Sequence, residues 1–135
     1  MLVSRGRVLL GHSTRPHRKV SMTDEFWTIS KGEMDKGETQ EQTALREFRE
    51  ETSIDLQALG LDIAHFTEYC TKSKRNTIFI CRDPDGRTLG ISPKCTTMVP
   101  VAGYPEIDAF HWATPSEARK MVFPSQQVIF SSDVI

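Results

Sequence analysis

The feature that most constrains the fold is a helix predicted to begin near Gln40. Thr39 and Gln42 have the spacing of a capping box, in which each side chain accepts a hydrogen bond from the backbone N–H of the other residue. Further along, Leu45 and Phe48 belong to one apolar stripe at helical spacing. The helix is therefore expected to bury one face in the core of the protein.

Three carboxylates crowd the second half of this helix. Glu47, Glu50 and Glu51 stand at positions i, i+3 and i+4, so their side chains project from one face. Like charges at this spacing repel, and the helix dipole disfavours each of them by about 0.3 to 1 kcal/mol. Arg46 and Arg49 offset part of this repulsion. Carboxylates also bind hard divalent ions such as magnesium. The helix alone therefore allows two interpretations: a surface helix whose charged side chains form ion pairs, or a helix that forms one wall of a metal site.

The loop in front of the helix favours the second interpretation. Residues 27–38, WTISKGEMDKGE, lead from a strand-like stretch to two glycines, Gly32 and Gly37. Glycine lets the backbone turn tightly and present a carbonyl or an N–H group to a ligand. We therefore expect the loop and the helix to form one site.

Residues 32–54, GEMDKGETQEQTALREFREETSI, resemble the Nudix box. The family pattern is G-x5-E-x7-R-E-U-x-E-E-x-G-U, in which U is a bulky apolar residue. The sequence matches it at every specified position except Ser53, where the family has Gly. This position ends the helix and favours a left-handed backbone, which costs a serine about 1 kcal/mol.

The resemblance implies an α/β fold, a Nudix-type α/β/α sandwich with a mixed β-sheet. We expect residues 1–135 to form a single domain of this kind. The implied cofactor is Mg²⁺, for which Mn²⁺ can substitute. The implied metal ligands are Gly32, through its carbonyl, Glu47, Glu50 and Glu51. The implied catalytic residues are Glu38 and Arg46 as orienting groups, and Glu47, Glu50 and Glu106, in that order, as candidates for the general base.

Two residues near the start of the box are predicted to contact substrate. Lys31 lies in a Ser-Lys-Gly sequence similar to the Pro-Lys-Gly of Nudix enzymes that act on dinucleoside polyphosphates, where its ammonium group would steady a phosphate. The alternative for Lys31 is an exposed lysine in a turn. Trp27 is either a wall beside the nucleotide or a core residue. For Glu106, which resembles the acid before a late Nudix strand, the alternative is an acid at a strand edge.

The resemblance implies a Nudix hydrolase that cleaves, with magnesium, a phosphoanhydride bond in a nucleoside diphosphate linked to another moiety. The Ser-Lys-Gly sequence favours a dinucleoside polyphosphate such as diadenosine tetraphosphate. A nucleoside triphosphate pyrophosphatase and an RNA 5′ pyrophosphohydrolase stay open, although RNA would need a longer basic track than residues 15–19 and 72–75 supply. The alternative from another class is an inactive nucleotide-binding regulator.

Composition narrows the partners. The net charge of -1 gives no global field for polyanions, so a small-molecule nucleotide held by local groups is expected rather than nucleic acid. Three cysteines without a CxxC pair indicate a reducing compartment. The apolar run at residues 8–10 is too short for a signal or membrane segment. We therefore expect a cytoplasmic protein with no membrane partner, and the sequence indicates no particular oligomeric state.

The remaining elements follow from alternation, turns and caps. Residues 2–3 are predicted to be the end of a first strand, and further strands are predicted over residues 7–13, 26–29, 63–71, 76–82 and 106–112. The fourth and fifth of the six form a hairpin. Thr114 and Pro115 predict a helix to about Met121, and a last helix is predicted within residues 125–135. Polar or irregular loops are expected over residues 14–24, 83–86 and 90–104.

Overall fold

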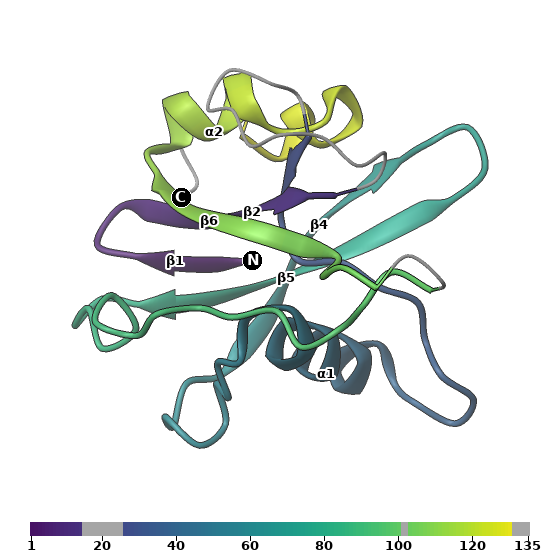
Figure 1. Ribbon diagram of the computed structural model, residues 1–135. Coiled ribbons are helices and arrows are strands. Elements are labelled where there is room, and N and C mark those ends of the chain that lie inside the picture. The colour runs from purple at the N-terminus through teal and green to yellow at the C-terminus, as the bar shows by residue number, and fades with distance from the viewer. Residues whose placement is uncertain (15–25, 101–102, 131–135) are drawn as a thin grey trace.

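The computed structural model describes residues 1–14, 26–100 and 103–130, in which three strands precede the first helix, three strands follow it, and two short helices come last (Figure 1). The strands are β1 (Leu2–Ser4), β2 (Arg7–Ser13), β3 (Trp27–Thr28), β4 (Ile63–Cys70), β5 (Arg75–Asp83) and β6 (Ile107–Ala113). The helices are α1 (Gln40–Thr52), α2 (Pro115–Met121) and the 3-10 helix η1 (Pro124–Phe130). The loop predicted at residues 14–24 lies outside the described residues except for Thr14.

The strands form one mixed six-stranded sheet. Its order is β3-β2-β1-β5-β4, and β6 also pairs with β2, from Val8 to Ser13. The pairing of β1 with β5 is parallel and the other strand pairs are antiparallel. α1 covers one side of the sheet, and α2 and η1 cover the other (Figure 1). The predicted α/β/α architecture with a mixed sheet is therefore confirmed.

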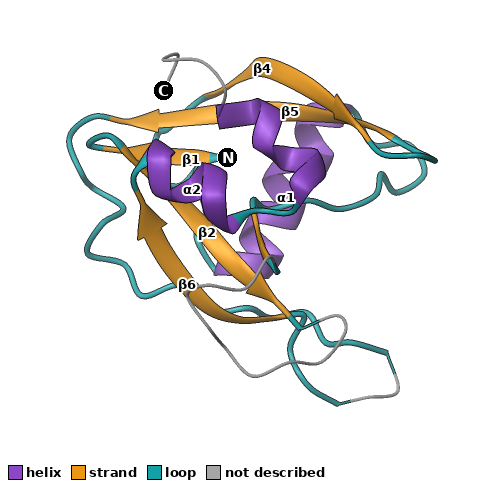
Figure 2. Cartoon of the chain, turned by 90° about the horizontal axis from the view of Figure 1, so that it is seen from above, coloured by secondary structure: helices purple, strands orange, loops and turns teal. Residues whose placement is uncertain are grey.

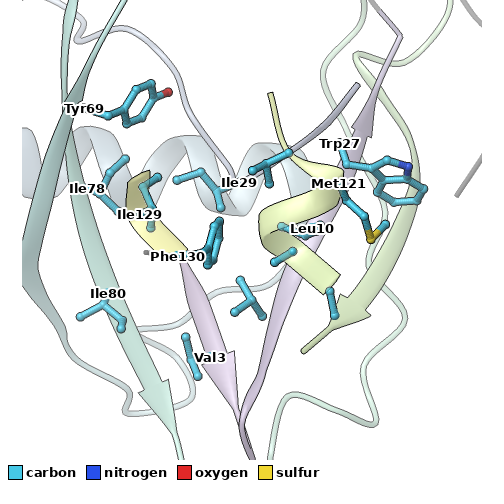
Figure 3. Packing of buried hydrophobic residues seen from close by; sticks show 14 residues of the cluster. Val3, Leu10, Trp27, Ile29, Tyr69, Ile78, Ile80, Met121, Ile129 and Phe130 are labelled. Atoms are coloured by element: carbon cyan, nitrogen blue, oxygen red, sulfur yellow. The ribbon is translucent and has the colours of Figure 1, made fainter. Parts of the chain in front are cut away.

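Alternation along the strands separates two buried clusters. Val8 and Leu10 of β2 face α2 and η1, whereas Leu9 between them faces α1. Figure 3 shows Ile129 and Phe130 of η1 packed between Ile78 of β5 and Leu10 of β2. The helices on both sides are thus fixed by apolar packing, and the sheet twists so that β4 and β5 diverge from β2 and β6 (Figure 2).

The element predictions hold closely where the caps and turns are strong. α2 has the predicted Thr114 cap and runs to Met121, and β4 and β5 form the predicted antiparallel hairpin. β3 is shorter than predicted, because only two of its residues pair with β2. Among the described residues, no helix is both long enough and apolar enough to cross a membrane.

A buried carboxylate ties the start of the chain to the end of β5. Asp83 is fully buried and accepts hydrogen bonds from the Ser4 hydroxyl at 3.0 Å and from the Thr88 N–H and hydroxyl at 2.8 and 2.6 Å. The Arg87 N–H also donates to it, at 3.1 Å. Burial alone would raise the pKa of Asp83, but these donors outweigh it and hold the pKa at about 2.

Replacing Asp83 with asparagine should lower the free energy of unfolding by about 2 to 4 kcal/mol, because an amide nitrogen would face buried donors that lose their acceptor. Urea unfolding followed by circular dichroism measures this. Asp85→Asn, an exposed change two residues away, is the matched control and should alter stability by less than about 0.5 kcal/mol. Equal stability of wild type and Asp83→Asn would contradict the proposed anchor.

The stabilisation from Asp83 should also depend on pH. An acid whose pKa is depressed on folding stabilises the protein above its unfolded pKa of about 4 and loses that effect as the pH falls through the folded value. The difference in unfolding free energy between wild type and Asp83→Asn is therefore expected to be constant above pH 5 and to shrink between pH 4 and about 2. A difference that does not change over this range would show that the carboxylate is not the stabilising group.

Candidate active site

Helix α1 is fixed at both ends by local hydrogen bonds. Thr39 and Gln42 form the predicted capping box, with the Gln42 N–H donating to the Thr39 hydroxyl at 3.1 Å and the Thr39 N–H donating to Gln42 at 2.9 Å. At the other end Ser53 adopts a left-handed conformation with φ 61°, and its hydroxyl donates to the carbonyl of Lys94. The second half of the helix, which carries the acids, is therefore held in a defined orientation.

The loop approaches the helix most closely at Gly32. A Cβ atom on Gly32 would lie 1.9 Å from the Cδ carbon of Glu47, far inside van der Waals contact. Only glycine leaves room for the Glu47 carboxyl group against the loop backbone. The requirement for glycine here is a close approach of two segments rather than a special backbone angle.

Arg46 connects the loop to the acids of the helix. Its Nε and Nη2 donate to the two carboxylate oxygens of Glu38 at 2.8 and 2.9 Å, and Nη2 also donates to the carbonyl of Glu33 at 2.9 Å. Its Nη1 donates to Glu47 at 2.8 Å and to Glu50 at 3.2 Å. Hydrogen bonding to Glu38 and Glu47 raises the pKa of Arg46 far above its ordinary range. The guanidinium is a permanent cation that orients three carboxylates.

Glu38 is the main partner of that cation. It also accepts from the Asp35 N–H at 2.8 Å and from the Thr43 hydroxyl at 3.1 Å. The hydrogen bonds from Arg46 are the main cause of its low pKa, about 2, and the Asp35 N–H adds to the effect. The side chain therefore stays ionised and holds Arg46 in place.

Three carboxyl groups lie near one another, and we call Glu47, Glu51 and Glu106 the acid cluster. The charges of Glu47 and Glu106 act on Glu51, and the charge of Glu106 also acts on Glu47. Glu51 is buried, with 5% of its surface exposed, and burial raises its pKa to about 8. The nearby charges of Glu47 and Glu106 raise that pKa further, whereas hydrogen bonds from the Ser30 side chain and the Lys31 backbone lower it. Burial is also the main cause of the raised pKa of Glu47.

Glu106, Glu50 and Lys31, which were also predicted as site residues, have different surroundings. Glu106 directly precedes β6 and accepts from the Thr97 hydroxyl at 3.3 Å. The Glu50 carboxylate points to Arg46, with 35% of its side chain exposed. Lys31 lines the cavity described below, and its ammonium group lies 5.3 Å from the ring centre of Phe123. Partial desolvation lowers the pKa of Lys31.

The prediction that Trp27 contacts substrate is corrected by its position. Only 1% of its surface is exposed, and its indole packs edge-on against His12 and His111, with ring centres 5.2 and 6.2 Å away. It belongs to the buried cluster beneath α2, where Figure 3 shows it beside Met121. A large aromatic side chain that is covered by a helix and two imidazole rings is more stable in the core than at a polar surface.

The donor set of the acid cluster fits a divalent cation. Glu47 and Glu51 supply carboxylate oxygens, and Gly32 brings the loop backbone against Glu47. Burial is the main cause of the raised pKa of both acids, and neighbouring carboxylates raise it further, Glu47 and Glu106 for Glu51 and Glu50 and Glu106 for Glu47. A bound cation would remove that cost. Within the described ranges no three acidic, His or Cys side chains already converge as a complete metal site, so the fit rests on donor chemistry.

A cavity of about 430 Å³ lies beside the acid cluster. It is bounded by the loop before α1, by one face of α1 and by the β4–β5 hairpin. Glu47 and Lys31 line it together with apolar residues such as Phe48 and Phe79. The sequence analysis missed this cavity, because no local pattern indicates that the hairpin stands opposite α1.

Comparison with known proteins identifies the family. The NUDIX domain model matches residues 1–131. The chain therefore belongs to the Nudix family. As a member of it, the protein is a Nudix hydrolase, an enzyme that acts on acid anhydrides. A search of curated proteins found no match.

Solved structures share the fold over almost the whole chain. Dihydroneopterin triphosphate pyrophosphohydrolase of E. coli is 23% identical, with a TM-score of 0.65 over 98% of this chain and 91% of that one. The Ap4A hydrolase of C. elegans, in a binary complex, is 20% identical, with a TM-score of 0.64 over 96% and 88%. The NUDIX domain of NrtR from Shewanella oneidensis, complexed with ADP ribose, is 14% identical, with a TM-score of 0.62 over 95% and 79%. At these identities the likeness concerns the fold alone.

The close approach at Gly32 makes a sharp prediction. Gly32→Ala should reduce hydrolysis of the best nucleotide substrate by about 100-fold or more, because the new methyl group displaces the Glu47 carboxyl by an ångström or more. Steady-state kinetics measures the loss. Gly90→Ala, which has no neighbour within 4 Å of its added methyl, is the matched control and should keep its activity. Similar activity of the two variants would exclude a role for the Gly32–Glu47 contact.

Proposed function

We propose that the protein hydrolyses a phosphoanhydride bond in a nucleoside diphosphate linked to another moiety, and that its substrate is a dinucleoside polyphosphate such as diadenosine tetraphosphate. The observation that carries this proposal is the buried carboxyl group of Glu51, with the charges of Glu47 and Glu106 nearby, together with a nucleotide-sized cavity that Glu47 lines. A divalent cation would stabilise the charged form of the buried Glu51 carboxyl group beside the partly exposed carboxylates of Glu47 and Glu106, and a pyrophosphate group binds the same kind of cation.

In this proposal Glu47, Glu51 and the carbonyl of Gly32 hold Mg²⁺, with Mn²⁺ as a substitute. When bound, the ion neutralises the diphosphate and makes its phosphorus more open to attack by water. Glu50 is the further ligand expected from the sequence, although its contact with Arg46 favours an orienting role in the structure described above. Arg46 and Glu38 keep the helix acids aligned with the loop.

One carboxylate must accept the proton of the attacking water. The candidates are Glu47, Glu50 and Glu106. The position of Glu106 supports it as a candidate, because its charge acts on both Glu47 and Glu51 of α1 although Glu106 itself lies just before β6. If Glu106 is the general base, Glu106→Gln should lower the turnover number strongly and leave the Michaelis constant nearly unchanged.

Several observations favour a dinucleoside polyphosphate. Lys31 is held beside the acid cluster and the cavity, where a second cation suits a chain of several phosphates. The Ap4A hydrolase of C. elegans and the E. coli enzyme that acts on dihydroneopterin triphosphate show that this fold carries small polyphosphate substrates in other proteins. The net charge of -1 gives RNA no general attraction.

A substrate screen tests the proposal. Dinucleoside polyphosphates, nucleoside triphosphates, sugar nucleotides and 5′-triphosphate RNA are incubated with and without magnesium, and the products are identified by mass spectrometry. Fastest magnesium-dependent turnover of a dinucleoside polyphosphate is the expected result. Preference for RNA or nucleoside triphosphates would replace the substrate assignment, and nucleotide binding without any hydrolysis would support a regulator instead.

Glu51 provides the most direct mutational test. Glu51→Gln should lower magnesium-dependent hydrolysis by more than about 100-fold, because a neutral amide is a poor ligand for a hard cation. The fold should persist, since the amide occupies nearly the same volume. Glu41→Gln, at an exposed site in the first turn of the same helix, is the matched control and should have normal kinetics. Near-normal turnover of Glu51→Gln in excess magnesium would refute the assignment.

A further inference from the structure

The cavity beside Glu47 is lined by both apolar and polar side chains. The apolar ones include Phe48 of α1, Ile63 of β4 and Phe79 of β5. The polar ones include Thr43 of α1 and Thr77 of β5. Thr77 and Phe79 face α1 because the alternate residues of β5 belong to the cluster on the other side of the sheet. Apolar surfaces with polar groups at the margin suit a flat heteroaromatic ring.

Two exposed contacts join residues that line this cavity. The ammonium group of Lys74, in the turn of the hairpin, forms an ion pair with Glu33, the residue after Gly32. Further along, the Gln40 side-chain amide donates to the Thr77 hydroxyl at 3.4 Å, so α1 also touches β5. Both contacts join segments that are distant in the sequence, and both lie at the surface.

The ion pair is weak enough to exchange. The side chains of Lys74 and Glu33 are 58% and 81% exposed, and pairs of this kind contribute little to stability. Lys74 also lies near Lys31, since its charge lowers the pKa of that residue. Two cations thus stand together at the opening, and only one nearby carboxylate, among the described residues, forms an ion pair with Lys74. A phosphate group would compete directly with Glu33 for Lys74.

We propose that this cavity binds the nucleobase of the substrate between α1 and the β4–β5 hairpin, and that Lys74 leaves Glu33 to bind a phosphate of the same nucleotide. The inference rests on the proposed function, because it assigns the part of the substrate next to the bond that is cleaved. The cavity volume of about 430 Å³ is enough for a base and its ribose. Glu33 then acts as a stand-in for phosphate when no nucleotide is bound.

The two partners of the ion pair should have opposite effects on binding. Lys74→Gln removes the phosphate contact and should weaken nucleotide binding by about three- to tenfold. Glu33→Gln removes the competitor and should tighten binding by about two- to fivefold. A contact that only supports the structure would weaken binding in both variants. Lys120→Gln, on α2 at the opposite side of the sheet, is the matched control and should leave binding unchanged.

Nucleoside 5′-monophosphates are the probes, because they have no phosphoanhydride bond and therefore report on binding alone. AMP, GMP, CMP and UMP are titrated into the protein in the presence of magnesium. Calorimetry measures the affinity, and NMR shifts of the backbone amide signals of Ala44 and Thr77 show where the nucleotide binds. Ribose 5-phosphate serves as the probe without a base. At least one monophosphate should shift both signals and bind at least tenfold more tightly than ribose 5-phosphate.

A cavity-filling variant checks the location independently. Ala44→Leu places a larger side chain in the cavity and should reduce monophosphate binding by at least tenfold, while its thermal unfolding stays cooperative. Shifts confined to the box loop with no change at Ala44 or Thr77 would overturn the inference, as would equal effects of Lys74→Gln and Glu33→Gln. Binding in the cavity by a protein that hydrolyses nothing would contradict only the proposed function, whereas hydrolysis without cavity binding would contradict only this inference.

Discussion

The guanidinium of Arg46 is the contact on which the site depends. It donates to Glu38, Glu47 and Glu50 and to the backbone carbonyl of Glu33, so one cation fixes the loop, the helix and their carboxylates together. Without it, the acids of α1 would repel one another and Glu38 of the loop would lose its cationic partner on the helix. Lysine could not replace it, because a point charge cannot hold four acceptors in a plane.

The fold supports this arrangement from both sides of the sheet. α1 is fixed by its capping box and by Phe48 in the cluster beneath it, and the loop before it continues from Ile29 in the opposite cluster. Gly32 then lies where the loop meets the helix. Glu51 is buried enough for its charge to be costly, and a cation bound there would offset that cost.

Local sequence signals predicted the parts of the fold that local chemistry decides. The Thr39 and Thr114 caps located both α-helices, and alternation located the hairpin. Residue spacing also brought Glu38, Arg46 and Glu47 together correctly, since they lie on one loop and one helix.

Contacts between segments that are distant in the sequence could not be predicted from local signals. Trp27 was open to two interpretations until the sheet placed it under α2, and the pairing of Lys74 with Glu33 joins residues 41 positions apart. The sequence predicted Asp83 only as part of a turn. Its burial could not be predicted, because it depends on β1 lying parallel to β5. The cavity likewise exists only because the hairpin folds over α1.

The central claim is that the carboxylates of Glu47 and Glu51 are crowded because they share a cation. Anomalous diffraction at the manganese absorption edge, from crystals grown with Mn²⁺ and a nucleotide, tests it most directly. The account predicts an anomalous peak in contact with both carboxylates and facing the nucleotide phosphates. Bound nucleotide with no peak beside these two acids would contradict it.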